Sequence, residues 1–260
     1  MPPVPVTQSD MSSPEYKYFL RDMVPPAPNT QARVEAGELT SAQAHSIDHM
    51  NDLFLDGYLD GEFGYCQMPD GTLAVANLML MPNITPAMFD WWFAWHGLAP
   101  IRYKLWNKDE HYDISTSNPE RRRDASIPVR ERIWDTIDYA TEENPIDGLH
   151  TVAIHFRNPV DIGFDKALYA AFNGTIICAA DEKSPVTMCH FVRPTENGSE
   201  LRTRFWMGYS IVDRRPKKVI PSGFKMPIQV AKNVLNHCNK EFANLIAILP
   251  ELYAEFRDIW

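Results

Sequence analysis

The sequence lacks the features that mark several large classes of protein. Its four cysteines are widely spaced and form no CxxC pair, which favours free thiols in a reducing compartment over a disulfide framework. Acidic residues outnumber basic ones by 34 to 25, so neither nucleic acid nor an anionic membrane is expected as a partner. No apolar run approaches the roughly 20 residues that cross a bilayer, and residues 1–30 show no secretory signal. The sequence therefore predicts a cytoplasmic protein.

Common catalytic motifs are also missing. The chain contains no GxSxG nucleophile elbow, no GxGxxG loop and no phosphate-binding GK[ST] loop. Its cysteines do not lie in the electropositive or helix-start setting that activates a thiol. The composition, 45% hydrophobic and 12% aromatic, is that of a globular protein with a well-filled core. Any catalysis is therefore expected to depend on a metal or on histidine and glutamate acid–base chemistry.

Local patterns in the first hundred residues predict an arm, two helices and a hairpin. Residues 1–30 are rich in proline and serine and are expected to form an extended arm, whose island Tyr16–Phe19 docks on the body or on a second subunit. The apolar spacing within Ser41–Asp60 predicts a helix. Asp70-Gly71 supplies a turn between two strand-like runs and predicts a β-hairpin. Thr85-Pro86 is typical of a helix start, and this aromatic helix is expected to end near Gly97.

Further along the chain, short apolar runs separated by turn residues predict strands. Asn197-Gly198 lies between the last two runs and predicts that they pair as a hairpin. The charged segment Pro119–Asp124 is expected to be a loop. The predicted strands are Ile127–Ile137, Thr151–Phe156, Thr175–Ala180, Val186–Arg193 and Leu201–Val212.

The clearest predicted element is a long C-terminal helix. From Pro227 onward, apolar residues recur at steps of three and four as far as Leu249, which indicates one buried stripe. Pro250 is expected to kink or end the helix. Antiparallel strands followed by one long helix predict an α+β helix-grip architecture, in which a curved sheet holds the helix. Such folds leave a cavity between sheet and helix.

His237 and Glu241 are the first candidates for a functional site. At i and i+4 they project from the same side of the predicted helix, in a strip that is otherwise apolar. Such a pair forms half of a metal site or a simple hydrogen-bonded pair. His96 is the second candidate, because it ends a tryptophan-rich helix where a neutral imidazole can bind a metal or pack as core.

Three stretches of the sequence resemble a known family. They are the segment 83–106 (NITPAMFDWWFAWHGLAPIRYKLW), the following Asp109-Glu110-His111, and the pair His237 and Glu241. They resemble the 2,4-diacetylphloroglucinol hydrolase family, which includes phloretin hydrolases. The resemblance implies a Bet v 1-like helix-grip domain at 65–260, preceded by an N-terminal arm and helical region at 1–64. It also implies a zinc ion held by two histidines and two glutamates, hydrolysis of a carbon–carbon bond, and a homodimer.

The resemblance further implies which residues bind the zinc. His96, His237 and Glu241 are expected to be three of the ligands. The remaining glutamate is expected after the first histidine. Glu131, within a predicted strand, is preferred for this position over Glu120, which lies in the polar segment.

The expected substrate is a small aromatic polyphenol. Water would add to the aryl ketone of phloretin or an acetylphloroglucinol, and the ring would leave as a carbanion stabilised by its hydroxyl groups. His190 and Tyr209 are expected to hold or protonate the substrate. Tyr103 is expected to form a hydrogen bond with a ring hydroxyl, and Trp92 and Trp206 are expected to provide flat walls for the ring.

Two other classes of protein fit the same residues. A non-catalytic helix-grip carrier of flat aromatic ligands would use the histidines structurally. A non-haem Fe(II) oxygenase would use two histidines and a carboxylate as iron ligands. Bound metal and oxygen demand distinguish these alternatives from the zinc hydrolase.

We predict that the chain forms a homodimer, because of its proline-rich arm, its aromatic surplus and the family resemblance. Light scattering should then give a mass about twice the 29.8 kDa of one chain. A single species of the chain's own mass at micromolar concentration would contradict this prediction.

Overall fold

One antiparallel sheet of eight strands forms the frame of the structure, a computed structural model that describes residues 3–144, 148–180 and 185–260. The strands follow one another across the sheet in the order β1-β2-β8-β7-β6-β5-β4-β3. A separate ribbon pairs β9 with β10. The strands are β1 Gly64–Gln67, β2 Leu73–Pro82, β3 His111–Thr116, β4 Ile137–Asn144, β5 Gly148–Arg157, β6 Thr175–Ala180, β7 Val186–Thr195, β8 Gly198–Met207, β9 Tyr209–Val212 and β10 Arg215–Lys218.

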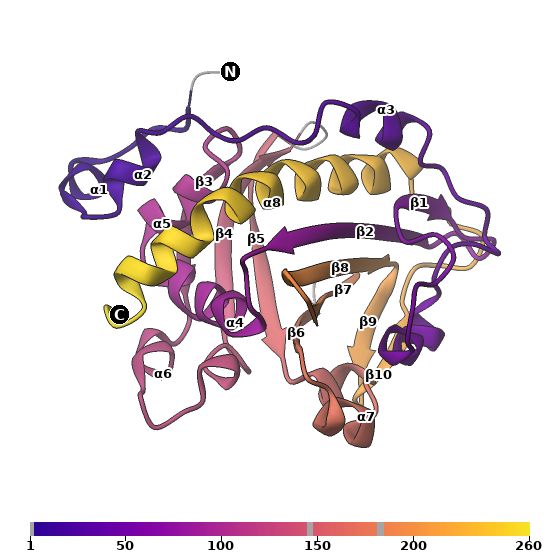
Figure 1. The fold of residues 1–260 in the computed structure, drawn as a ribbon. Coiled ribbons are helices and arrows are strands. Elements are labelled where there is room, and N and C mark those ends of the chain that lie inside the picture. The colour runs from indigo at the N-terminus through magenta and orange to yellow at the C-terminus, as the bar shows by residue number, and fades with distance from the viewer. Residues whose placement is uncertain (1–2, 145–147, 181–184) are drawn as a thin grey trace.

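The helices lie mainly at the two ends of the chain and in the connection between β2 and β3 (Figure 1). The α-helices are α1 Gln8–Ser12, α2 Tyr16–Phe19, α3 Thr30–Glu35, α4 Pro86–Trp95, α5 Pro100–Trp106, α6 Pro119–Arg123, α7 Lys166–Ala171 and α8 Ile228–Phe256. The 3₁₀ helices are η1 Ile47–Phe54, η2 His96–Leu98, η3 Val129–Glu131 and η4 Pro159–Ile162. Among the described residues, no helix combines the length and the apolar character that a membrane span requires.

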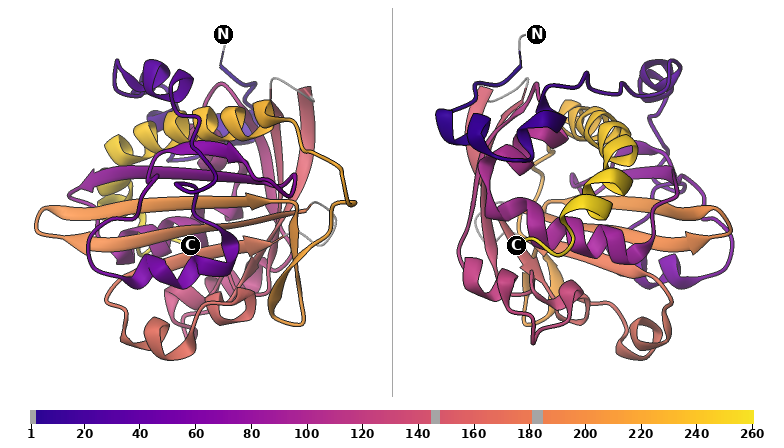
Figure 2. Two further views of the ribbon diagram at one scale, coloured as in Figure 1. Left: turned by 90° about the vertical axis from the view of Figure 1, so that its right-hand side faces the viewer. Right: turned by 60° about the vertical axis from the view of Figure 1, so that its left-hand side comes forward.

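The sheet curves around α8, as the two views of Figure 2 show. On the face of the sheet that contacts this helix, which we call the concave face, Leu73 and Val75 pack against Ala231 and Leu235. This arrangement confirms the predicted α+β class with a long C-terminal helix held by an antiparallel sheet. The side chains of the predicted apolar stripe that are buried are Ala231, Leu235, Cys238, Phe242, Leu245 and Leu249.

The sequence predicts that Pro250 kinks or ends the helix. The predicted end is wrong, because α8 continues past Pro250 to Phe256. A proline inside a helix costs about 3 kcal/mol, since it removes a hydrogen bond and crowds the preceding turn. The residues beyond it offset this cost, because Leu252 and Phe256 are almost fully buried in the main core. Burial of each such side chain contributes roughly 1.5–3 kcal/mol.

Both hairpins predicted from turn residues are confirmed. Strands β1 and β2 pair on either side of a turn in which Gly71 has φ +88°, a conformation that favours glycine. Strands β7 and β8 pair from Thr195 and Gly198 onward. The helix start at Thr85 is also confirmed, since its hydroxyl accepts a hydrogen bond from the amide of Met88.

Several predicted elements are wrong in type. Residues 127–136 do not form a strand, because Pro128 lacks an amide donor, and the segment turns through η3 before β4 begins at Ile137. The polar segment predicted as a loop contains α6, which Asn118 caps. The α-helix predicted over residues 41–60 is replaced by the shorter 3₁₀ helix η1. The strand predicted through residue 212 is interrupted at Gly208, where φ is +103°.

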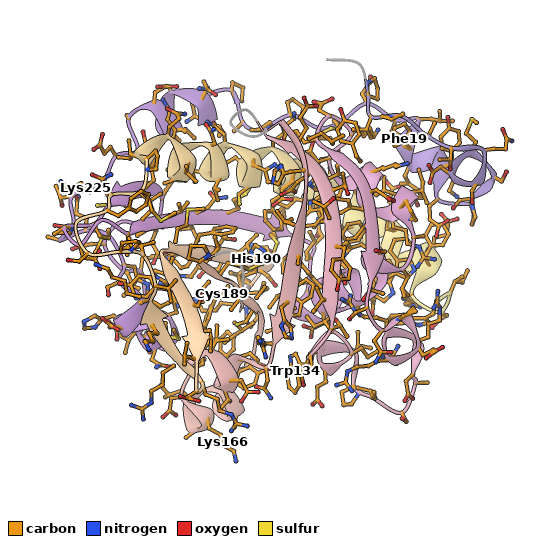
Figure 3. All side chains as sticks on the ribbon, turned by 180° about the vertical axis from the view of Figure 1, so that it is seen from behind. Phe19, Trp134, Lys166, Cys189, His190 and Lys225 are labelled. Atoms are coloured by element: carbon orange, nitrogen blue, oxygen red, sulfur yellow. The ribbon has the colours of Figure 1, made fainter. Side chains whose placement is uncertain are left out.

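The N-terminal arm docks on the body of the same chain. Val4, Tyr18 and Phe19 are buried in the main core. Two buried ion pairs attach the arm to α5, between Asp10 and Lys104 at 2.7 Å and between Glu15 and Arg102 at 2.8 Å. Figure 3 shows Phe19 at the opposite end of the molecule from Lys225, which shortly precedes α8.

The opposite, convex face of the sheet is covered by residues before β1 and by the segment that runs from η4 through α7. There, Trp206 belongs to a second core with Ile47 and Met50. Glu62 accepts hydrogen bonds from the guanidinium groups of Arg202 and Arg204, both fully buried on β8. Burial alone would raise the pKa of Glu62, but the hydrogen bonds and charges of the two arginines lower it from 4.5 to about 2. Glu62 therefore fixes the N-terminal region to the sheet as a carboxylate.

Glu62→Gln is expected to flatten the acid dependence of stability. A carboxylate whose pKa is lowered by folding stabilises the fold above its unfolded pKa, and this contribution is lost as the pH falls through its folded pKa. The shift corresponds to a loss on the order of 3 kcal/mol between about pH 5 and about pH 2. Urea unfolding across this range measures the slope. Glu251→Gln, at an exposed surface pair with Arg21, is the control that keeps the native slope. The same slope in Glu62→Gln and the native chain would contradict the prediction.

Candidate metal centre

A cavity of about 780 Å³ lies between α8 and the concave face of the sheet. This volume is within the range of small-molecule sites, which are typically about 300–1,000 Å³. Most of its wall is apolar, and the segment before and at the start of α3 contributes Pro26, Ala27 and Gln31. Apolar side chains that line it from the sheet and helix include Ile154, Phe156, Met188, Phe205, Val230 and Val234. The cavity is therefore suited to a largely apolar ligand.

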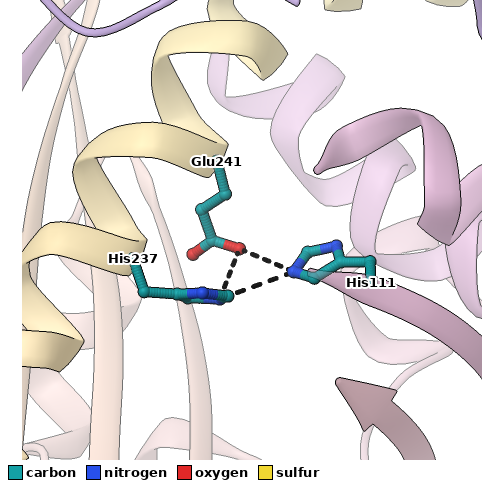
Figure 4. A group of neighbouring side chains, drawn as sticks. All are labelled: His111, His237 and Glu241. Atoms are coloured by element: carbon teal, nitrogen blue, oxygen red, sulfur yellow. Dashed lines mark hydrogen bonds and ion pairs between the residues drawn. The ribbon is translucent and has the colours of Figure 1, made fainter. Parts of the chain in front are cut away.

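Polar groups that can bind a metal gather at one part of this cavity (Figure 4). His111 Nε2 lies 3.4 Å from His237 Nε2 and 3.6 Å from Glu241 Oε2. His237 Nε2 lies 3.5 Å from Glu241 Oε2. An ion at roughly 2.0–2.1 Å from each of its ligands in tetrahedral geometry keeps the ligand atoms about 3.3–3.4 Å apart. The three atoms therefore have the separation that one zinc-sized ion requires.

Glu142 supplies a further carboxylate beside this group. It lies directly opposite His111 in the antiparallel pairing of β3 with β4. Its Oε2 is 3.9 Å from His237 Nε2 and accepts a hydrogen bond of 3.0 Å from the Tyr103 hydroxyl. Two imidazoles and two carboxylates thus converge from α8 and from the two strands at the edge of the sheet.

The orientation of both imidazole rings is fixed through Nδ1. His237 Nδ1 donates to Glu110 Oε2 at 2.7 Å, and His111 Nδ1 donates to the carbonyl oxygen of Tyr103 at 3.2 Å. The Tyr103 ring also stacks on His111, with 3.9 Å between centroids and 3° between planes. Both Nε2 atoms are therefore directed toward Glu241.

The charge distribution of the centre favours a cation. Burial alone would lower the pKa of His237, but the charge of Glu241 and the hydrogen bond to Glu110 raise it well above its ordinary value. Burial, together with the positive charge on His237, lowers the pKa of His111 well below its usual range. Burial raises the pKa of Glu241. Protonated His237 thus places a positive charge beside Glu110, Glu142 and Glu241, and Lys240 adds a second one at Glu110.

His190 lies elsewhere on the cavity wall, near the middle of the sheet on β7 (Figure 3). Its Nδ1 lies 2.9 Å from Thr203 Oγ1 on the neighbouring strand. Burial lowers the pKa of His190 to about 3, so the ring is neutral at neutral pH. Its edge contacts the ring of Phe242, with centroids 5.1 Å apart. His190 is therefore placed to form a hydrogen bond with a ligand in the cavity.

The structure does not bring the other three sequence-derived ligand candidates to His237 and Glu241. His96 lines the cavity, but its ring packs among aromatic side chains, and among the described residues the clustered ligand atoms belong to His111, His237 and Glu241. Burial lowers the pKa of His96 to about 3. Glu131 lies in η3 and Glu120 in the exposed α6, and neither lines the cavity.

Of the other residues expected to contact the substrate, one lines the cavity and three do not. Tyr103 lines the cavity beside the cluster. Trp92 is fully buried in the core behind the cavity wall, and Trp206 is on the convex face, where its indole donates to the carbonyl of His45. Tyr209 is on β9, where its hydroxyl lies 3.4 Å from Asp70 Oδ2, and it does not line the cavity.

Sequence reasoning missed His111 and Glu142 as members of this group. His111 opens a six-residue strand, β3, whose bounds the sequence did not predict, although His111 is expected to lie in or beside a strand. Without β3, the pairing that places Glu142 opposite His111 could not be inferred. The available signal was the acidic and histidine-containing run at 109–111, directly after the aromatic segment that carries the family resemblance.

Comparison with known proteins extends over nearly the whole chain. A family model described as the DAPG hydrolase PhiG domain matches residues 45–254. The chain is 32% identical over 261 residues to phloretin hydrolase of Eubacterium ramulus, which covers 98% of this chain and 94% of that protein. It is 27% identical over 263 residues to 2,4-diacetylphloroglucinol hydrolase of Pseudomonas protegens, which covers 94% and 85% respectively. Among solved structures, Ara h 8.0201 aligns with 70% of this chain and 99% of its own, with a TM-score of 0.42 and 11% identity.

His111→Ala and His237→Ala are each expected to abolish stoichiometric zinc binding, because each removes one of the clustered nitrogen donors. His96→Ala should fold less stably but still bind zinc, since the clustered ligand atoms belong to His111, His237 and Glu241. Metal content of the purified variants measures this. Glu255→Ala, at a surface pair near the end of α8, is the control that is expected to keep the metal content of the native chain. Loss of zinc in His96→Ala with retention in His111→Ala would reverse the assignment.

Proposed function

This chain belongs to the DAPG hydrolase family, and on that premise we propose that it is a zinc-dependent hydrolase of acylphloroglucinols. Water adds to the aryl ketone, the bond between the carbonyl carbon and the ring breaks, the ring carbon takes a proton, and a carboxylic acid is released. Phloretin and acetylated phloroglucinols are the candidate substrates, because they are what two similar proteins are named for. The observation that carries the proposal is the His111, His237 and Glu241 group in the wall of a large apolar cavity.

We propose His111, His237, Glu241 and Glu142 as the zinc ligands. Two nitrogen and two oxygen donors suit zinc, and the separations of the first three fit one ion. When bound, zinc supplies Lewis acidity, which polarises a ketone and makes water more acidic. The donors also suit iron, so the identity of the metal is part of the proposal.

Side chains around the cluster would position the substrate. Burial raises the pKa of Tyr103 well above its usual value, with a further contribution from the charge on Glu142, so its hydroxyl remains a hydrogen-bond donor. Neutral His190 can hold a ring hydroxyl from the other side of the cavity. The ring leaves with negative charge, and donors to its hydroxyl oxygens stabilise that charge as it develops. We therefore assign His190 to binding and polarising the phloroglucinol ring, and Tyr103, whose hydroxyl proton is donated to Glu142, to accepting a hydrogen bond from a ring hydroxyl.

The apolar wall would hold the substrate ring and its acyl chain away from bulk water. Phe93 and Trp106 present aromatic surface at the cavity, and Val230 and Val234 present aliphatic surface from α8. Aromatic side chains pack well against a flat ring. Exclusion of water from this region also strengthens the polar contacts of the site.

We predict that the purified chain converts phloretin to phloroglucinol and a phenylpropionate under strictly anaerobic conditions. Removal of metal by a chelator should abolish turnover, because the water and the ketone then lack the Lewis acid. Stoichiometric zinc should restore it. Product formation is followed by chromatography, with monoacetylphloroglucinol and diacetylphloroglucinol assayed in parallel.

Three results would contradict the proposal in different ways. A requirement for oxygen and iron would indicate the oxygenase. Tight phloretin binding without metal or turnover would indicate the carrier. Zinc-dependent turnover of an ester with no activity on any acylphloroglucinol would place the substrate in another class.

A further inference from the structure

We propose that Glu110 is a positioning residue for the metal centre, which it serves by orienting His237. The inference rests on the proposed zinc site and adds a residue that is not one of its ligands. Glu110 Oε2 accepts the hydrogen bond of 2.7 Å from His237 Nδ1. The opposite nitrogen, Nε2, is the atom that lies 3.4–3.9 Å from His111, Glu241 and Glu142. Glu110 and the proposed metal thus occupy the two opposite edges of one imidazole ring.

The carboxylate of Glu110 is itself held in place by other side chains. Lys240 Nζ donates to Oε1 at 2.8 Å, and Asn107 Nδ2 donates to Oε2 at 2.9 Å. Lys240 follows His237 by three residues on α8, so it lies near the same side of the helix. Both oxygens of Glu110 are therefore fixed, and the direction of its hydrogen bond to His237 is set before any metal binds.

The two histidines differ in the acceptor that each one meets. His111 Nδ1 donates to a neutral backbone carbonyl at 3.2 Å, whereas His237 Nδ1 donates to a carboxylate at 2.7 Å. A charged acceptor makes a shorter and stronger hydrogen bond and increases electron density on the ring. The partner of a ligating imidazole fixes its tautomer and raises its strength as a ligand. His237 is therefore expected to be the stronger nitrogen ligand of the pair.

The position of Glu110 in the sequence gives this contact a second consequence. Glu110 ends the short connection between α5 and β3 and immediately precedes His111, the first residue of β3, so the group that orients His237 adjoins the other proposed nitrogen ligand. Correct placement of this connection would set both histidines at once. A displacement of residues 107–111 would disturb both nitrogen donors.

Zinc affinity of the full-length chain tests the proposal by competition with a chromophoric chelator. Glu110→Ala should weaken zinc binding by about 10–100-fold, the range found when such partners of ligating histidines are removed. Glu110→Gln should be weakened less, because its amide oxygen still accepts the hydrogen bond but carries no charge. Asp109→Asn is the matched control, because Asp109 also pairs with Lys240, at 2.8 Å, whereas the carboxylate that accepts from His237 Nδ1 is that of Glu110. The Asp109→Asn variant should bind zinc like the native chain.

Replacement of zinc by Co²⁺ gives a readout that a general loss of stability does not produce. The visible absorption of bound Co²⁺ reports the arrangement of its ligands. It should change in Glu110→Gln and stay native in Asp109→Asn. If Glu110→Ala does not fold, as judged by circular dichroism, the Glu110→Gln and Asp109→Asn pair decides the question.

Native zinc affinity and a native Co²⁺ spectrum in folded Glu110 variants would overturn the positioning role. His237→Ala, measured in the same titration, separates this outcome from failure of the proposed function. If His237→Ala loses zinc and the Glu110 variants do not, only the role of Glu110 is wrong. If the native chain binds no zinc, or His237→Ala binds it normally, the proposed metal site fails and the role of Glu110 fails with it.

Discussion

A histidine and a glutamate on the buried side of a long helix need polar partners, and this constraint organises the functional half of the molecule. Helix α8 is held in the sheet by an apolar stripe, and His237 and Glu241 face the cavity beside that stripe. Burying such groups without partners is costly. The partners come from one edge of the sheet, where β3 provides His111 and β4 provides Glu142. The aromatic connection from α4 to α5 then brings Tyr103 against the same group.

The two faces of the sheet therefore differ in how their buried polar side chains are arranged. On the concave face, His111, His237, Glu142 and Glu241 gather at the wall of a cavity. On the convex face, the buried charges are paired within the protein, as Glu62 is with Arg202 and Arg204. Because neighbouring residues of a strand point to opposite faces, Thr203 can contact His190 while Arg204 contacts Glu62. Along β8, residues that contact the candidate site thus alternate with residues that pair with Glu62.

The sequence predicted those parts of the fold that depend on local patterns. The periodic stripe of α8, the cap at Thr85 and the two glycine turns each involve residues close together in the chain, and all are confirmed. His237 and Glu241 were identified because a helix places them together. His111 and Glu142 are 31 positions apart and meet through strand pairing, a contact that no local pattern encodes. Glu131 was chosen on a predicted strand, and the proline at 128 prevents that strand.

The strand pair β3 and β4 closes one edge of the sheet, where fewer neighbours constrain its alignment. A slip of one residue would turn the side chains of one strand to the other face, and His111 would no longer lie with Glu142. A bulge between His111 and Asp113 already adjusts the alignment at this point. The four-residue cluster therefore forms only when β3 and β4 pair in the native register at this edge of the sheet. In a refolding experiment, metal uptake would then count the molecules whose edge strands have aligned correctly, separately from those that have merely regained a compact core.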